Sequence, residues 1–380
     1  MDNFRLNSKI VLIDCDVEAI LELEHILLSD MRSIFFRNRR TLYMAATETG
    51  TGNQLIDRFG RRINYLRISV TDRCDLRCVY CMSEDMQFVP RAQLLTLEEV
   101  VRIGRVFSEL GVSKIRITGG EPLTRKNVIE VFRQLGKLNE IRDLTLTTNG
   151  TLLNKFAGEL HRAGVNRINI SLDTLQEERF SSITRTGKLH RTMAGIDAAL
   201  DTGFDRIKLN AVILKNRNHD EVIDLVEFAH NRGMDISFIE EMPLGVIGDH
   251  DRAEAYISSD EILDILRQRH ELIPTTDNTG GPARYYRRSD NGARVGFISP
   301  HSHNFCDTCN RVRLTAEGRL LLCLGQEHSV DLRRVVRASP TDDAPLREAI
   351  IGAMDIKPHG HDFDLSSQPV IFRHMNSTGG

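Results

Sequence analysis

The stretch LRISVTDRCDLRCVYC, residues 66–81, joins a short apolar and β-branched run to three closely spaced cysteines. The run at 66–70 predicts a strand. Cys74, Cys78 and Cys81 follow it directly, so three thiols can converge from one loop. A four-iron cluster normally takes four thiolates, and three would leave one iron with an open position. A structural zinc site would need a fourth ligand, and no His or Cys occurs in the ten residues after Cys81.

Apolar runs continue along the chain and alternate with stretches of helical periodicity. We expect strands at 66–70, 114–118, 144–148, 167–171, 206–213 and 236–242, and helices near 97–110, 126–137, 152–163, 189–202 and 219–232. Strands that alternate with helices indicate right-handed βαβ units and a parallel sheet. Six such units suit either a partial (β/α) barrel or a doubly wound sheet.

The pattern changes after residue 270. Two hairpins are expected, 285–288 with 295–298 and 312–315 with 319–324, the first turning at Asn291-Gly292. Helices are expected near 329–338 and 341–354, and residues 357–380 read as irregular. We therefore divide the chain into an extension of unknown role at 1–54, an α/β region at 55–270 and an α+β region at 271–380.

A second cysteine set lies in the last region. Cys306, Cys309 and Cys323 again number three. Zinc is a rival here, because His301 or His303 could be a fourth ligand. Cys15 stands alone and is expected to pack as a small apolar residue.

Composition limits the class of protein. The 380 residues carry 53 acidic and 50 basic side chains, a net charge of −3 that does not predict nucleic acid binding. Seven cysteines, an odd number, argue against a fully disulfide-bonded protein. No apolar segment reaches the length of a membrane span, and no secretory signal is evident, so we expect a cytoplasmic protein with no membrane partner.

The motifs together resemble a known family. The first cysteine triad with Tyr80, and TGGEP at 118–122, resemble the radical S-adenosylmethionine (SAM) superfamily. LRISVTDRC at 66–74, TTNG at 147–150, the second triad, NRVR at 310–313 and the final Gly379-Gly380 resemble the GTP 3′,8-cyclase family of molybdenum cofactor biosynthesis. The likeness runs from about residue 55 to residue 380. One departure is Ser83, where that family usually has proline after Cys-Met.

The resemblance implies a fold and a reaction. The fold would be a partial (β/α)6 TIM-type barrel, the radical SAM core, followed by a C-terminal α+β region that carries a second iron–sulfur cluster. The cofactors would be SAM and two 4Fe-4S clusters, one on Cys74, Cys78 and Cys81 and one on Cys306, Cys309 and Cys323. The enzyme, a lyase, would convert GTP to 3′,8-cyclo-7,8-dihydro-GTP through a 5′-deoxyadenosyl radical, the first step of molybdenum cofactor biosynthesis.

The resemblance also implies roles for single residues. Those matching the SAM contacts are Tyr80, Gly120, Glu121, Ser171 and Met242. Those matching the GTP contacts are Arg67, Arg116, Thr147, Lys208, Arg311 and Arg313, and the last two, with Gly379 and Gly380, match the residues of catalysis. The residues themselves agree in part, because helices cover the outside of a barrel and cations within its strands are then expected to face inward, where guanidinium groups bind phosphate.

Partners and alternatives complete the expectations. The resemblance implies an external electron donor and a next enzyme, cyclic pyranopterin monophosphate synthase, and it is compatible with a homodimer. One alternative is a radical SAM enzyme that acts on a peptide, which would not need Arg311, Arg313 or the Gly-Gly end. The other is a zinc-binding module without catalysis.

Overall fold

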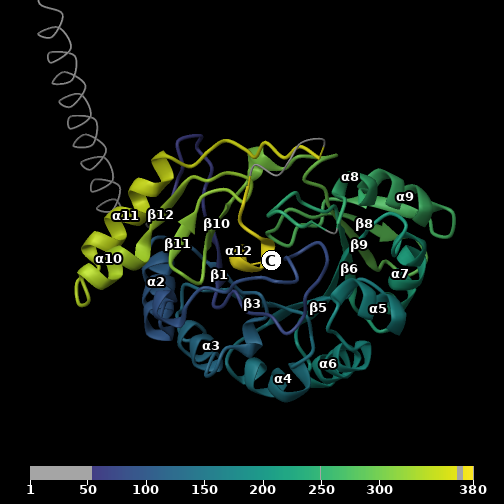
Figure 1. The fold of residues 1–380 in the computed structure, drawn as a ribbon, viewed down its shortest axis with the longest axis horizontal. Coiled ribbons are helices and arrows are strands. Elements are labelled where there is room, and N and C mark those ends of the chain that lie inside the picture. The colour runs from purple at the N-terminus through teal and green to yellow at the C-terminus, as the bar shows by residue number, and fades with distance from the viewer. Residues whose placement is uncertain (1–53, 249, 366–370, 380) are drawn as a thin grey trace, which may run out of the picture. The chain divides into compact units, whose positions relative to one another are not determined.

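Six parallel strands form the centre of the fold and stand side by side in chain order (Figure 1). They are β1 (Tyr65–Ser69), β2 (Lys114–Thr118), β3 (Asp143–Thr148), β4 (Arg167–Ser171), β5 (Arg206–Val212) and β6 (Asp235–Ile239). Each pairs in parallel with the next one along the chain. A doubly wound sheet reverses its strand order, so this sheet is the partial (β/α)6 barrel that the sequence predicted.

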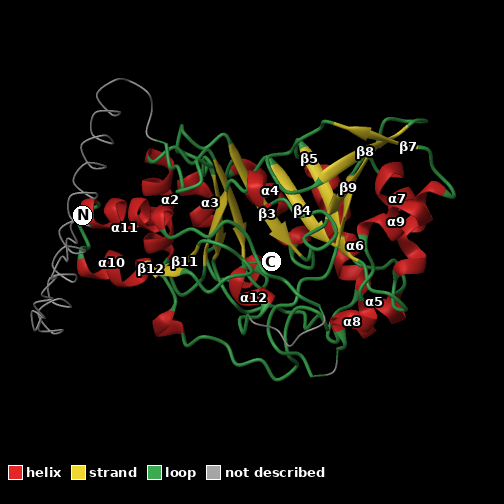
Figure 2. Ribbon diagram, turned by 90° about the horizontal axis from the view of Figure 1, so that it is seen from above, coloured by secondary structure: helices red, strands yellow, loops and turns green. Residues whose placement is uncertain are grey.

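Helices cover the outer side of the strands, as Figures 1 and 2 show. They are α2 (Leu97–Glu109), α3 (Ile129–Leu135), α4 (Leu153–Arg162), α5 (Glu177–Thr184), α6 (Leu189–Thr202) and α7 (Val222–Asn231). The first of them begins at a capping box of Thr96 and Glu99, and its Ile103 and Phe107 are fully buried. Between helices and sheet lies the apolar core, to which each strand contributes alternate residues.

The C-terminal strands extend this sheet at both ends. β9 (Arg294–Ile298) pairs in parallel with β6 and is followed outward by β8 (Arg284–Arg288) and β7 (Leu272–Thr275). β10 (Arg311–Leu314) pairs in parallel with β1 and is followed by β11 (Arg319–Leu321) and β12 (Ser329–Asp331). Both predicted hairpins are confirmed. Within the described residues the sheet has twelve strands and does not close, because β12 and β7 are its outermost strands.

The remaining helices are short or lie in the C-terminal half. They are α8 (Arg252–Ala255), α9 (Ser259–Arg267), α10 (Leu332–Ala338), α11 (Ala344–Asp355) and α12 (Met375–Thr378), with 3-10 turns at Arg91–Gln93, Pro122–Thr124, His219–Glu221 and Cys306–Thr308. The sequence did not predict α5, α8, α9, α12, β7 or β12.

Several predicted boundaries differ from the observed ones by up to three residues, and two of them have a clear physical cause. The strand expected at 236–242 ends at Ile239, so Met242 lies beyond it. Pro243 cannot donate to a ladder. The buried Glu240 carboxylate accepts hydrogen bonds from Ser259 at the start of α9 and from the Ser302 hydroxyl. The helix expected at 329–338 begins only at Leu332, because the three residues before it pair with β11.

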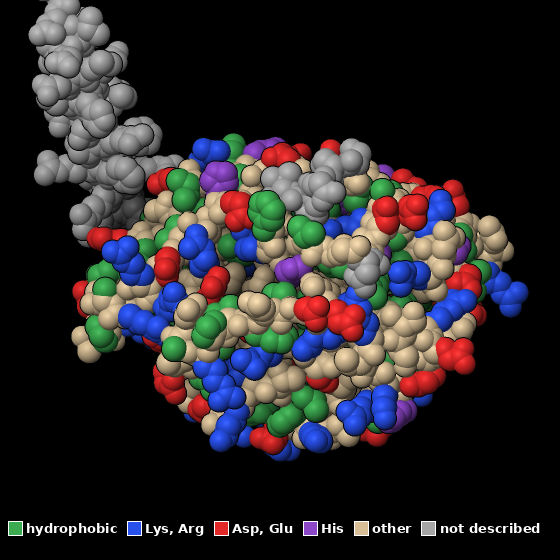
Figure 3. Space-filling view, in the orientation of Figure 1, with side chains coloured by type: hydrophobic (Ala, Val, Ile, Leu, Met, Phe, Trp, Pro, Cys, Tyr) green, Lys and Arg blue, Asp and Glu red, His purple; other side chains and the backbone are tan. Residues whose placement is uncertain are grey.

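The structure describes residues 54–248, 250–365 and 371–379. These fall within one compact unit, Gln54–Gly380. Cys15 and residues 1–53 of the expected extension lie outside the described residues, and the division at residue 270 stays a prediction. No helix in the described ranges is long and apolar enough to cross a membrane. Figure 3 shows Lys and Arg interspersed with Asp and Glu on the face in view.

Candidate active site between two cysteine triads

The inner face of the sheet lines one cavity, and all six cysteines of the two triads border it. Strand alternation explains the lining, because residues of β1 to β5 that point away from the helices point into the barrel. The cavity also brings together most of the predicted site residues: Arg67, Tyr80, Arg116, Gly120, Thr147, Ser171, Lys208, Met242, Arg311 and Arg313.

The two triads lie at opposite ends of the parallel strands. Cys74 and its partners follow β1, at the carboxyl ends of the parallel strands. Cys309 instead precedes β10 and Cys323 follows β11, and β10 runs parallel to β1 with Arg311 opposite Tyr65. The second triad therefore lies at the amino ends of the parallel strands. The length of β1, roughly 13 Å for five residues, separates it from the first triad. The sequence did not predict this separation.

The first triad offers three sulfur donors with hydrogen-bond donors around them. Leu76 N lies 3.4 Å and Asn149 Nδ2 3.7 Å from Cys74 Sγ. Burial raises the pKa of Cys74, Cys78 and Cys81, a cost that metal coordination overcomes, since a coordinating thiol is deprotonated. This donor set fits an iron–sulfur cluster with three thiolate ligands.

The two glycines of the TGGEP loop pack against the cysteine loop. Gly120 N donates to Thr71 O at 2.7 Å, and a Cβ on Gly120 would lie 2.5 Å from Arg73 O. No larger residue fits without moving one of the two loops. The glycine pair therefore fixes the position of the first triad relative to β2.

Glu121 does not line the cavity. Its buried carboxylate accepts hydrogen bonds from Asn149 N at 2.7 Å, Leu123 N at 3.0 Å and Thr148 Oγ1 at 2.9 Å. Burial raises its pKa to about 8, although the hydrogen bonds from Asn149 and Leu123 act in the opposite direction. The structure thus places Glu121 behind the cavity wall, where it joins the loop after β2 to the end of β3, and its contact with SAM stays a prediction.

Other predicted SAM contacts lie at the rim beside the first triad. Ser171 ends β4, and Met242 lies three residues beyond the end of β6. Tyr80 Oη donates to Asp173 Oδ2 at 2.7 Å, and Asp173 in turn accepts from Val212 N at 2.9 Å. That pair fixes the tyrosine ring, and Asp173 is a cavity residue that no sequence motif indicated.

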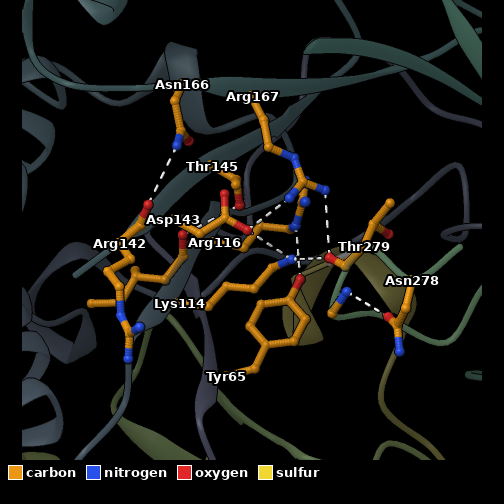
Figure 4. A network of polar contacts seen from close by, with 12 residues as sticks. Tyr65, Lys114, Arg116, Arg142, Asp143, Thr145, Asn166, Arg167, Asn278 and Thr279 are labelled. Atoms are coloured by element: carbon orange, nitrogen blue, oxygen red, sulfur yellow. Dashed lines mark hydrogen bonds and ion pairs between the residues drawn. The ribbon is translucent and has the colours of Figure 1, made fainter. Parts of the chain in front are cut away.

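Positive charge lines the cavity between the triads. Seven cationic side chains border it: Arg67, Lys114, Arg116, Arg167, Lys208, Arg311 and Arg313. Sequence reasoning missed Lys114 and Arg167. Asp143 pairs with both, at 3.0 Å and 2.9 Å, so one carboxylate serves two cations (Figure 4). The signal that could have found Lys114 was strand alternation, because it lies two positions before Arg116 in β2.

Tyr65 lies among these cations (Figure 4). Its Oη accepts from Arg116 Nε at 2.8 Å and from Arg67 Nη1 at 3.3 Å. Burial raises the pKa of the phenol, but the charges of Arg116, Arg67, Lys114 and Arg311 outweigh it and lower the pKa to about 6. A phenol so acidic indicates a strong excess of positive charge, which is suited to a polyanion.

The C-terminal segment enters the same cavity, and Figure 1 shows α12 inside the arc of strands. Gly379 O accepts from Arg67 Nη2 at 2.9 Å and from Arg313 Nη1 at 3.3 Å. Asn376 Nδ2 donates to Asp72 O at 2.8 Å and ties this segment to the loop before the first triad. The other predicted terminal residue, Gly380, lies outside the described residues.

The second triad also presents three sulfur donors to the cavity. Burial raises the pKa of Cys309, but the charges of Lys357 and Arg311 outweigh it and the pKa is lowered. The histidines considered as a fourth zinc ligand bond elsewhere. His301 Nε2 lies 2.8 Å from Glu241 O, and His303 Nε2 lies 2.9 Å from the Asp260 carboxylate.

Comparison with known proteins agrees with this geometry. Residues 68–229 match the radical SAM superfamily, and residues 234–363 match the family described as Molybdenum Cofactor Synthesis C. A GTP 3′,8-cyclase of Marinobacter nauticus is 59% identical over 327 residues, 86% of this chain and 99% of the relative. That of Saccharophagus degradans is 59% identical over 326 residues, 86% of this chain and 98% of the relative.

Among solved structures, Streptococcus suis SuiB bound to S-adenosylmethionine shares the fold. The TM-score is 0.54 at 18% identity, over 81% of this chain and 70% of that one. This likeness concerns the fold alone, whereas the high identity of the cyclases extends over nearly their whole length. The chain is therefore a member of the GTP 3′,8-cyclase family within the radical SAM superfamily.

Proposed function

We propose that this chain converts GTP to 3′,8-cyclo-7,8-dihydro-GTP, the first step of molybdenum cofactor biosynthesis. The observation that carries the proposal is the cavity itself, which has a cysteine triad at each end and seven cationic side chains along its lining. A triphosphate is the ligand that such a lining fits, because guanidinium groups bind phosphate oxygens bidentately.

The SAM end of the site is the end of the cavity that Cys74, Cys78 and Cys81 border. SAM bound beside a cluster on these cysteines would supply, on one-electron reduction, the 5′-deoxyadenosyl radical that abstracts hydrogen from the substrate. Tyr80, Gly120, Ser171 and Met242 would hold SAM, while Glu121 would position the loop from behind.

The GTP end extends to the second triad. Arg67, Arg116, Lys208 and Thr147 would hold the nucleotide within the barrel. Arg116 Nη1 donates to Thr147 Oγ1 at 3.1 Å, so these two side chains are already oriented together. Lys114 and Arg167, which share Asp143, are further cations within reach of a phosphate chain.

The second triad would hold another 4Fe-4S cluster with one open iron for the guanine base. This role makes the missing fourth protein ligand functional, since the substrate supplies it. Arg311 and Arg313, two residues apart on β10, would act near the ring-closing step together with Gly379 and Gly380. Enclosure in the barrel would exclude water from radicals.

The reaction needs partners. An external one-electron donor would reduce the first cluster, and the product would pass to cyclic pyranopterin monophosphate synthase. A homodimer stays a prediction.

Anaerobic reconstitution with iron and sulfide, followed by incubation with a reductant, SAM and GTP, tests the proposal. We expect 5′-deoxyadenosine and a cyclised GTP product in equal amounts by liquid chromatography and mass spectrometry. Formation of 5′-deoxyadenosine without a GTP-dependent product would overturn the cyclase assignment and leave radical SAM chemistry in place.

The second triad has its own test. Cys306→Ala is expected to retain the first cluster and SAM cleavage and to lose the cyclised product. Cys15→Ala is the matched control, because Cys15 belongs to neither triad, and it should leave both products unchanged. Unchanged product formation in Cys306→Ala would exclude a substrate-binding role for the second triad.

A further inference from the structure

Lys357 is a buried cation beside the second triad. Its side chain is 1% exposed. Nζ donates to Leu322 O at 2.5 Å and to Arg311 O at 3.2 Å, and it lies 3.9 Å from Cys309 Sγ. The two carbonyls belong to the two chain segments that carry Cys309 and Cys323, so one ammonium group joins both.

Arg61 provides an internal comparison, because it is a second buried cation in the same region. Its Nε pairs with Asp57 Oδ2 at 2.7 Å, and its Nη atoms donate to Cys306 O at 2.7 Å and Pro358 O at 2.8 Å. Lys357 has no such partner, since no described carboxylate lies within ion-pairing distance of its Nζ. Burying a charge without a counter-ion costs free energy, so an anion is needed beside Lys357.

The anion that the geometry offers is the second triad itself. Gly360 packs closely against this triad, since a Cβ there would lie 3.1 Å from Cys306 Sγ. An oxidised 4Fe-4S core carries two positive charges, and three thiolates bring the total to −1. One-electron reduction makes it −2, so a fixed positive charge favours the reduced form.

We propose that Lys357 is the buried counter-ion of the second cluster, holding the segments of Cys309 and Cys323 together and raising the reduction potential of the cluster. The inference rests on the proposed function, which places a cluster on this triad. Lys357 touches no substrate in this account and is a positioning residue.

A redox titration monitored by electron paramagnetic resonance tests the role of the charge. Reconstituted wild type and Lys357→Met are compared, and Cys306→Ala, which keeps only the first cluster, identifies the signal of each. We expect the midpoint potential of the second cluster to fall in Lys357→Met. A tenfold change in the ratio of oxidised to reduced cluster corresponds to about 59 mV for one electron. The potential of the first cluster is the internal control, and Lys155→Met, at an exposed position of α4, should change neither potential.

An unchanged second potential in Lys357→Met, with the iron content of both clusters retained, would overturn the inference. If Lys357→Met loses the second cluster and keeps the first, Lys357→Arg decides between charge and packing. Recovery of the cluster and its potential in Lys357→Arg supports the counter-ion, and failure to recover overturns it. A wild-type protein with the iron of a single cluster would instead overturn the proposed second cluster itself, a result that the iron analysis reports separately.

Discussion

The phenol oxygen of Tyr65 accepts a hydrogen bond from Nε of Arg116 at 2.8 Å, inside the cavity between the two cysteine triads. Arg67 donates to the same oxygen at 3.3 Å. One phenol therefore orients two of the guanidinium groups that we propose hold GTP. Because its pKa is lowered to about 6, the phenol is ionised at neutral pH and neutralises part of the cationic lining.

Tyr65 should link GTP binding to pH. The phosphates of GTP add negative charge beside the phenolate, and this raises the pKa of Tyr65, so binding takes up a proton. Below pH 6 the phenol is already protonated and no uptake occurs. Above pH 6 the affinity of wild type should weaken relative to that of Tyr65→Phe by up to about tenfold per pH unit, because one pKa unit is worth 1.36 kcal/mol.

Titration calorimetry in buffers of different ionisation enthalpy measures the proton uptake directly. Tyr65→Phe is the control for ionisation of GTP itself, which is common to both proteins. Equal proton uptake by the two proteins at pH 8 would contradict the prediction. The affinity for SAM should be the same in wild type and Tyr65→Phe, because Tyr65 begins β1 and the first triad follows the other end of that strand.

Substitution of the buried Glu121 should lower the stability of the fold. In Glu121→Gln, the NH2 group replaces an oxygen that accepts from Asn149 N or Leu123 N, and one buried donor loses its partner. The free energy of unfolding should fall by about 1–3 kcal/mol, measured by urea denaturation. Glu130→Gln, at an exposed position of α3, is the matched control and should stay within about 0.5 kcal/mol of wild type. Equal stability of the two variants would show that the buried acceptor is dispensable.

Substitution of Gly120 should impair the first cysteine triad and leave the second intact. In Gly120→Ala, the Cβ would lie 2.5 Å from Arg73 O and displace the loop that leads to Cys74. We expect the variant to lose SAM cleavage and the iron of the first cluster while it retains the second. The control is Gly352→Ala in α11, where a Cβ meets nothing within 4 Å and helix stability should rise by roughly 0.5–1 kcal/mol. Retention of both clusters and of SAM cleavage by Gly120→Ala would mean that the loop tolerates the shift.

Local patterns predicted much of this fold, and long-range pairing accounts for what they missed. Strands 114–118 and 167–171 agree with the structure residue for residue, because each alternates inward polar and outward apolar side chains. The placement of the second triad depends on β10 adding beside β1, a pairing between distant parts of the chain that no local pattern encodes. Burial of Glu121 is equally non-local, since it follows from the approach of the end of β3.

The site residues divide in the same way. Motifs identified the cysteines and most cations, because those positions follow family signatures. Tyr65 and Lys114 carry no signature, and strand register places them opposite Arg311 and Asp143. Asp173 acts through Tyr80 and could be found only in three dimensions.

Substitution of Gly379 should uncouple SAM cleavage from formation of the cyclised product. Its φ of +80° is a conformation that alanine rarely adopts, and a Cβ would lie 2.2 Å from Thr118 Oγ1. In Gly379→Ala the carbonyl that accepts from Arg67 and Arg313 must therefore move. Misplacement of about 1 Å can lower a rate by about 10²-fold, so cyclised product should fall by that order while 5′-deoxyadenosine still forms. Ser377→Ala is the control within the same segment, because among the described residues its hydroxyl donates to His374 O alone. Mass spectrometry measures the ratio of cyclised product to 5′-deoxyadenosine in each variant. An equal ratio in Gly379→Ala and Ser377→Ala would exclude a role for the Gly379 carbonyl in orienting Arg67 and Arg313.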